Sequence, residues 1–263
     1  MKKCFALLLT LMCLVCSCAS ADDFSLRGYD KKQGYQYIYF GEFPQDADGT
    51  VRPILWRVLS VDETQAYLLS EYILFNNRVH PDDKEYIAFG GAFNQTEMFA
   101  LLNGPFAGNP IPKEEQDTLK ARERLGRVHI AEICFKDQAF TQAEQEMLIS
   151  DEELGMVFLA SADDLKNKGM GFVSSKNRQA WGTEYALENG LFQYQNGTSP
   201  YWTRSQSLSY DYGTRCTKVD GNLGYIRCVV MNEGCRPAIR LSLQGLDAVG
   251  GNGTKDDPYT FVR

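Results

Sequence analysis

Histidine is scarce in this sequence, and the motifs that build most hydrolytic and metal sites are missing. The 263 residues include two histidines, His80 and His129, and no C-x-x-C pair. Zinc sites use cysteine and histidine ligands at short spacings, so a zinc site is disfavoured. The absence of a G-x-S-x-G elbow disfavours a serine hydrolase. We expect His129, which alternates with apolar neighbours, to be structural or on the surface, and His80, which precedes Pro81, to be solvated.

An excess of positive charge and a long apolar run are also lacking. Lys and Arg number 27 against 34 Asp and Glu, for a net charge of −7. Nucleic acids and anionic membrane surfaces call for a basic surface, so neither is an expected partner. The apolar run at residues 5–15 is broken only by Thr10 and is shorter than the roughly 20 residues that span a bilayer. No low-complexity segment or long charge run is present.

The first residues have the pattern of an export signal. Lys2 and Lys3 precede the apolar run, and Ala19-Ser20-Ala21 offers a cleavage site before Asp22. A second interpretation takes residues 15–18 as a loose lipobox, which would leave Cys18 as a lipid-modified N-terminus. We therefore expect residues 1–21 to be a signal peptide and the remaining chain to be extracytoplasmic, either secreted or anchored as a lipoprotein.

Four cysteines lie beyond this region, and they are Cys134, Cys216, Cys228 and Cys235. Export permits disulfides, and four cysteines allow three connectivities. Residues 213–230 have the pattern of a hairpin that turns at Asp220-Gly221-Asn222. A turn centred on Asn222 predicts a Cys216–Cys228 bridge, and Cys134 would then pair with Cys235.

The order of expected elements is strands, then helices, then strands. Strands are expected at residues 35–41, 54–59 and 66–70, and again at residues 201–204 and 236–243. Helices are expected between them, with Asn94 and Thr141 as N-caps because Glu97 and Glu144 follow three residues later. This order predicts an α+β fold. We divide the chain into a flexible lead-in at 22–34, a single domain at 35–245 and a Gly-rich tail at 246–263.

A series of short motifs resembles an uncharacterised bacterial extracytoplasmic domain family, a domain of unknown function of secreted and surface proteins. The motifs are Phe40-Gly41 with Pro44, Trp56-Arg57-Val58-Leu59, Leu68-Leu69-Ser70, Tyr201-Trp202-Thr203-Arg204-Ser205 and Arg236-Pro237-Ala238-Ile239. The carboxy half is similar to the C-type-lectin-like fold of formylglycine-generating-enzyme-like modules. The resemblance implies a twisted antiparallel sheet with two or three helices, and it implies no activity.

The candidate binding residues are aromatic side chains in the carboxy half. Exposed aromatic faces stack on sugars and anchor protein partners. The candidates are Tyr194, Tyr210, Tyr212 and Tyr225, with Arg204 beside them. Trp56 and Trp202 are expected in the core. Arg204 and Arg236 have a structural alternative, in which each pairs with a buried acid or a backbone carbonyl.

Calcium is the only candidate cofactor, through the oxygens of Asp220 and Asn222. Asp-Gly-Asn is also a common hairpin turn, and the Glu-Pro-Asn and Trp-Asn-Asp triplets of sugar-binding C-type lectins are absent. We therefore expect an exported, non-enzymatic module that binds a glycan or an envelope protein at the bacterial cell surface. The alternatives are an enzyme that acts on the envelope and a structural envelope module.

Overall fold

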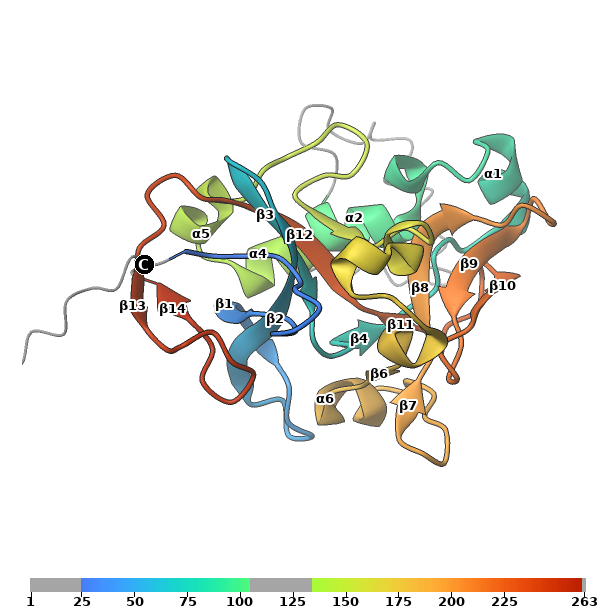
Figure 1. The fold of residues 1–263 in the computed structure, drawn as a ribbon. Helices are drawn as coiled ribbons and strands as arrows, with labels where there is room; N and C mark the ends of the chain where they lie inside the picture. The colour runs from blue at the N-terminus through green and yellow to red at the C-terminus, as the bar shows by residue number, and fades with distance from the viewer. Residues whose placement is uncertain (1–24, 105–133, 262–263) are drawn as a thin grey trace, which may run out of the picture.

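The computed structural model describes residues 25–104 and 134–261 (Figure 1). The signal peptide at 1–21, the lipidation candidate Cys18 and His129 lie outside these residues. The described chain forms two five-stranded sheets, two small two-stranded sheets and several short helices. The expected α+β class is therefore confirmed.

The first sheet has the strand order β1-β2-β3-β12-β5, and every pairing in it is antiparallel. Its strands are β1 (Tyr37–Pro44), β2 (Val51–Val61), β3 (Gln65–Ser70), β12 (Pro237–Ser242) and β5 (Val157–Leu159). β2 is buried from Ile54 to Leu59, and these residues are apolar except for Arg57. Trp56 at its centre is fully buried, and its indole N–H donates to the carbonyl of Phe40 at 2.7 Å. The expected core position of Trp56 is confirmed.

The second sheet has the order β10-β9-β8-β11-β4 and holds the other buried tryptophan. Its strands are β10 (Leu223–Arg227), β9 (Gly213–Thr217), β8 (Tyr201–Gln206), β11 (Gly234–Cys235) and β4 (Phe75–Asn76). Trp202 on β8 is 1% exposed, and its indole N–H donates to the carbonyl of Asn77 at 2.7 Å.

Two short segments pass from one sheet to the other. β3 leads into β4 through residues 71–74, and β11 leads into β12 through Arg236 alone. In Figure 1 the first sheet occupies the centre, and β8, β9 and β10 lie at the right. The β3–β4 and β11–β12 connections are thus the short ones, whereas the β4–β5 and β5–β8 connections between the sheets are long.

The helices are short and more numerous than the two or three expected. The α-helices are α1 (Asp83–Ala88), α2 (Glu97–Asn103), α4 (Phe135–Ala139), α5 (Gln142–Glu146) and α6 (Glu184–Glu188). The 3₁₀ helices are η1 (Phe93–Gln95), η2 (Asp164–Lys166), η3 (Lys168–Met170) and η4 (Ser175–Arg178). The Thr141–Glu144 capping box is confirmed at α5. Asn94 is not the cap of α2, because Asn94 lies within η1 and the hydroxyl of Thr96 accepts from the Phe99 N–H instead.

The ends of the described chain are packed against the first sheet. Residues 25–34, which we expected to be a flexible lead-in, bury Leu26 and bind β2 through the Tyr29 N–H and the carbonyl of Leu59. The Gly-rich tail forms β13 (Ala248–Gly250) and β14 (Thr260–Phe261). Tyr259 pairs with Ile38 as a parallel bridge to β1. The folded unit therefore extends beyond residues 35–245 at both ends.

The expected hairpin is confirmed, but the expected disulfides are absent. β9 and β10 pair so that Thr217 faces Leu223, which centres the turn on Asp220 rather than Asn222. This difference places Cys216 opposite Gly224, while the Cys228 N–H binds the carbonyl of Tyr212. Cys134, Cys216, Cys228 and Cys235 are all free thiols. Burial raises the pKa of Cys216 to about 12, which keeps it a neutral core side chain.

These positions predict how the thiols react with iodoacetamide. Unfolded chain 22–263, alkylated without reductant, is expected to gain four adducts by intact mass. In the folded protein Cys134 should react first, because it is half-buried and the other three are buried. A chain that accepts four adducts only after reduction would contradict the free-thiol structure.

Candidate binding site

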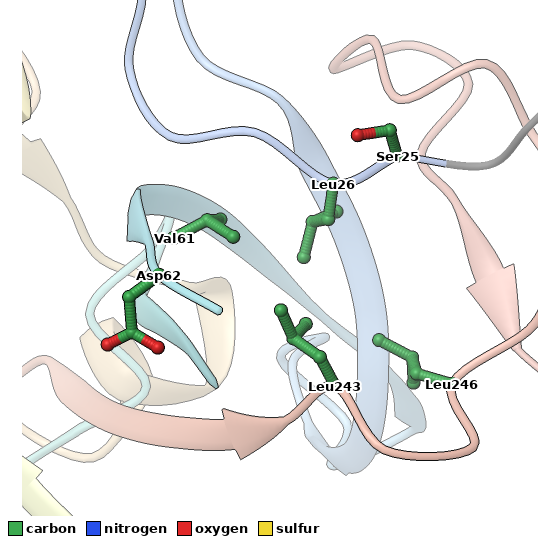
Figure 2. A pocket seen from close by; sticks show the side chains of 6 residues that line it. All are labelled: Ser25, Leu26, Val61, Asp62, Leu243 and Leu246. Carbon is green, nitrogen blue, oxygen red and sulfur yellow. The ribbon is translucent and has the colours of Figure 1, made fainter. Parts of the chain in front are cut away.

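A pocket of about 280 Å³ lies beside the N-terminal described residues (Figure 2). Leu26, Val61, Leu243 and Leu246 form its apolar walls, and Figure 2 shows Leu26 and Leu243 pointing toward one another. Its titratable group is Asp62, whose carboxylate accepts from the backbone N–H groups of residues 64 and 65 in its own turn. The pocket therefore brings together no set of groups with catalytic chemistry.

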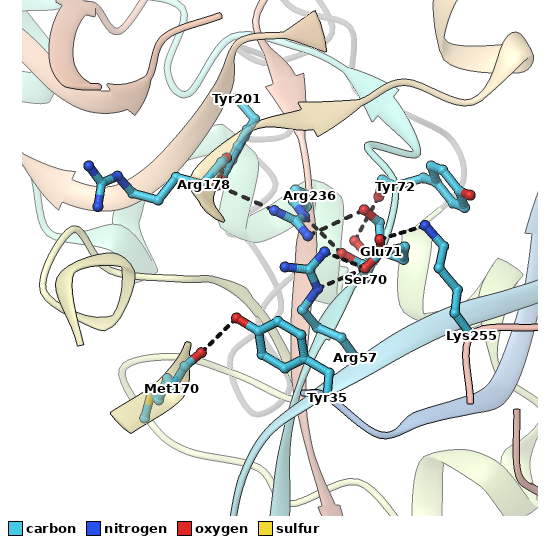
Figure 3. Close-up of polar contacts among 10 residues, drawn as sticks. All are labelled: Tyr35, Arg57, Ser70, Glu71, Tyr72, Met170, Arg178, Tyr201, Arg236 and Lys255. Atoms are coloured by element: carbon cyan, nitrogen blue, oxygen red, sulfur yellow. Dashed lines mark hydrogen bonds and ion pairs between the residues drawn. The ribbon is translucent and has the colours of Figure 1, made fainter. Parts of the chain in front are cut away.

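A buried charge cluster surrounds Glu71, just after β3 (Figure 3). The carboxylate oxygen Oε2 of Glu71 accepts from Arg57 Nε at 2.7 Å, and Oε1 accepts from Lys255 Nζ at 2.9 Å. Burial by itself would raise the pKa of Glu71, but the charge of Arg57, then Arg236, outweighs burial, so the pKa lies below its ordinary value. Glu71 is therefore an anion between strand β2 and the tail.

Arg236 completes this cluster from the segment between β11 and β12. Its guanidinium donates to the carbonyls of Ser70 at 2.8 Å and Glu71 at 3.3 Å, and to the Tyr201 hydroxyl at 3.3 Å. All three of its nitrogens thus have partners inside the fold. The structural alternative for Arg236 is confirmed.

Arg204 is also held inside the fold. Its Nη1 donates to the carbonyl of Leu159 at 2.7 Å and to the carboxylate of Asp164 at 2.9 Å. Tyr67 donates its hydroxyl to the same carboxylate at 3.0 Å. These contacts join β8 to β5 and η2, so Arg204 has the structural role rather than a place beside the candidate tyrosines.

Three of the four candidate tyrosines form one exposed row. The ring centroids of Tyr210 and Tyr225 are 4.9 Å apart, and those of Tyr210 and Tyr212 are 5.5 Å apart. The rings are inclined to each other by 42° and 32°, and the three residues are 37% to 47% exposed. Tyr210 lies in the middle of this tyrosine row.

Local hydrogen bonds in the β8–β9 loop hold Tyr210 in place. The Ser207 hydroxyl accepts from the N–H groups of Ser209 and Tyr210, and the Gly213 N–H donates to the carbonyl of Tyr210. Tyr225 comes from β10, across the hairpin. A hydrogen bond to Tyr210 raises the pKa of the exposed Tyr225 phenol, so its hydroxyl stays protonated at neutral pH.

Tyr194 lies on a different surface. Its N–H binds the carbonyl of Thr198 in the loop before β7 (Thr198–Ser199), which pairs with β6 (Ala180–Trp181). In Figure 1 this loop is at the lower edge of the molecule, and the Thr198 hydroxyl donates to the carbonyl of Val219 in the β9–β10 turn. Tyr210 and Tyr212 precede Gly213, at the opposite end of that hairpin. Tyr194 is 49% exposed and, within the described chain, makes no ring contact with the tyrosine row.

The calcium candidates are engaged with each other in the hairpin turn. The carboxylate of Asp220 accepts from the Asn222 N–H at 2.9 Å and from Asn222 Nδ2 at 2.8 Å. These bonds lower the pKa of Asp220. In residues 25–104 and 134–261 there is no group of three or more His, Cys, Asp or Glu side chains arranged to hold a metal ion.

Two buried titratable groups were not found by sequence reasoning. His80 is 8% exposed rather than solvated, and its Nδ1 accepts from the Glu97 N–H at 3.4 Å. Glu233 is 8% exposed, and burial raises its pKa to about 7. Its Oε2 has no hydrogen-bond partner among the described residues. Nothing in the sequence separates Glu233 from the other acids, because its burial depends on strands distant in the chain.

Residues 63–243 match a family described as Domain of unknown function (DUF6273). The chain belongs to this family. The match runs from the turn before β3 to the residue after β12, so it includes the whole tyrosine row. Neither the curated proteins nor the solved structures include a match to the chain.

The family match confirms the expected uncharacterised domain family. The folded unit in the structure is larger than the matched residues. β1, β2 and the tail lie outside the matched residues, yet they complete the first sheet and the Glu71 cluster.

Within the part of the chain that the structure describes, no helix is both long and apolar enough to cross a membrane.

The Glu71 cluster predicts a large loss of stability on charge removal. Glu71→Gln leaves the buried cations Arg57 and Arg236 without their anion, and breaking a buried pair in this way costs about 3–5 kcal/mol. Urea unfolding measures the change. Asp46→Asn is the matched control, because its pair with Arg52 is on the surface and is worth less than about 1 kcal/mol. Equal effects of the two substitutions would contradict the structural role of Glu71.

The buried Glu233 predicts a stability that falls as pH rises. Its pKa is about 7 in the fold against 4.5 for the free side chain, so the folded state keeps a proton that the unfolded chain releases. The contribution of the protonated carboxyl is complete below pH 4.5 and is lost as pH approaches 7. In urea unfolding, the stability of Glu233→Gln relative to the wild type should therefore increase by roughly 3 kcal/mol between pH 4.5 and pH 8. The exposed Glu152→Gln is the control, and a pH-independent difference for Glu233→Gln would rule out the titration.

Proposed function

We propose that this chain is a non-enzymatic glycan-binding module that works at the bacterial cell surface. The observation that carries the proposal is the tyrosine row, in which three exposed phenol rings follow one another at 4.9 and 5.5 Å. Large, rigid aromatic faces bind the apolar faces of sugar rings, and their hydroxyls supply hydrogen bonds.

The support under the row favours recognition of a rigid ligand. Tyr225 is on a regular strand, Tyr210 is held by the Ser207 turn, and the carbonyl of Tyr212 accepts from the Cys228 N–H. Little conformational entropy is lost when such side chains bind, because tyrosine has two rotatable bonds and this loop is already ordered.

The groups that an enzyme would use are in poor positions for it. Burial raises the pKa values of Cys228 and Cys235, which disfavours thiolate chemistry. The backbone N–H of Glu97 donates to Nδ1 of His80, and the other ring nitrogen of His80 faces Glu85 at 3.3 Å, so both ring nitrogens have protein neighbours. These observations favour binding over an envelope-acting enzyme.

The cellular site and the finer fold belong to the same proposal. The export pattern at residues 1–21 supports an extracytoplasmic location, with Cys18 as the anchor if the chain is a lipoprotein. The β9–β10 hairpin, which pairs with β8 in an antiparallel arrangement, supports a C-type-lectin-like fold. In such a fold loops carry the ligand on a rigid sheet scaffold.

The proposal predicts which tyrosines matter. Chain 22–263 is tested on an array of glycans and cell-wall polymers, with and without calcium, and dissociation constants are measured for the ligands retained. Tyr210→Ala, in the middle of the row, is expected to weaken binding about tenfold or more, because stacking on an aromatic face is worth about 1–3 kcal/mol. Far-ultraviolet circular dichroism checks that the variant is folded.

Tyr194→Ala is the matched control, since it removes an equally exposed tyrosine from another surface. Equal losses for Tyr210→Ala and Tyr194→Ala would contradict the tyrosine row as the site. An empty array would overturn the glycan proposal in favour of an envelope protein partner, which a pull-down from envelope extracts would identify.

A further inference from the structure

We propose that the glycan is acidic and that Arg215 binds its carboxylate or phosphate group. This inference rests on the glycan-binding function proposed above. In this inference Arg215 makes the protein prefer charged ligands to neutral ones. No sequence motif pointed to this residue.

Arg215 lies beside the tyrosine row by strand register. β9 and β10 are antiparallel, and Arg215 is directly opposite Tyr225. Directly opposed residues point to the same face of a sheet, with Cβ atoms about 4.5–5.5 Å apart. The ring of Tyr225 meets Tyr210 on that face. A sugar stacked on the row therefore has the Arg215 side chain at its edge.

Arg215 differs from every other arginine in residues 25–104 and 134–261. The other nine donate to a carboxylate or a backbone carbonyl, or lie within 4 Å of a carboxylate. For Arg215, no side-chain hydrogen bond, ion pair or stacked ring is present in the described chain; its backbone carbonyl accepts from the Thr203 hydroxyl at 2.9 Å. A guanidinium carries five N–H donors and stays charged, so these donors are available to a ligand.

The charged residues near Arg215 do not neutralise its guanidinium. Arg227 follows Tyr225 by two residues on the same strand face, and it pairs with Asp83. Asp211 is exposed in the loop between Tyr210 and Tyr212 and is the acid closest to the row in sequence. We expect Asp211 to weaken anion binding moderately, which gives a variant that should act in the opposite direction to loss of Arg215.

The chemistry of the set fits a sugar that carries an anion. The planar guanidinium binds a carboxylate or phosphate through two parallel hydrogen bonds, while the phenol rings accept the face of the sugar ring. The chain as a whole has a net charge of −7, so it repels acidic polymers in general. A preference for acidic glycans therefore needs a local cation such as Arg215.

The test compares ligands that differ only in charge. The probes are the tetramer of galacturonic acid and its methyl ester, and a glycerol phosphate oligomer provides phosphate without a sugar ring. Isothermal titration with chain 22–263 is expected to show that the acid binds about tenfold more tightly than the ester. Arg215→Gln should remove this difference and leave the affinity for the ester unchanged, and Asp211→Asn should increase the affinity for the acid.

Arg52→Gln, an exposed arginine of the first sheet, is the control for charge. Arg215-dependent binding of galacturonate supports a carboxylate ligand, and Arg215-dependent binding of glycerol phosphate supports a phosphate ligand. Equal affinities for acid and ester, or an acid affinity that Arg215→Gln leaves unchanged, would overturn this inference alone. If Tyr210→Ala changes neither affinity, the tyrosine row itself is not the site.

Discussion

The carboxylate of Glu71 is the interaction on which the arrangement of this molecule depends. It lies where β3 leaves the first sheet, and its ligands come from β2 and the C-terminal tail. Arg236, where β11 becomes β12, binds the carbonyls of Ser70 and Glu71. Charged groups are rarely buried unless they are paired, so this set tolerates few alternative arrangements. The two short connections between the sheets, β3 to β4 and β11 to β12, meet at this point.

This arrangement determines which side chains the second sheet exposes at its surface. β8 and β9 are held by the buried Trp202 and by the contacts of Arg204 with Leu159 and Asp164. The β8–β9 loop carries Tyr210 and Tyr212, and the hairpin of β9 and β10 carries Tyr225 and Arg215 beside them. A loop site on a rigid sheet combines chemical variety with fixed geometry, which a binding module requires.

Local sequence patterns predicted the secondary-structure elements better than they predicted which residues of those elements lie opposite one another. The alternating strand residues, the Thr141–Glu144 capping box and the hairpin at Asp220 are properties of short segments, and the structure has them. The predicted disulfides depended on the hairpin register. A shift of the turn centre from Asn222 to Asp220 was enough to place Cys216 opposite Gly224. Register depends on turn geometry, which a composition pattern does not specify within two residues.

For the candidate site, too, the sequence predicted some features and the tertiary structure decided the others. The residue types in the sequence alone identified Tyr210, Tyr212 and Tyr225 as surface aromatics and Trp56 and Trp202 as core, because exposure follows from polar or apolar neighbours. Tertiary structure decided that Tyr194 lies on another surface, that Arg204 is held by Asp164, and that Glu233 is buried with a pKa of about 7. It also decided that Arg215 lies opposite Tyr225. Each of these facts depends on which distant strands are neighbours, and the pairing of strands is set by burial and hydrogen bonding over the whole chain.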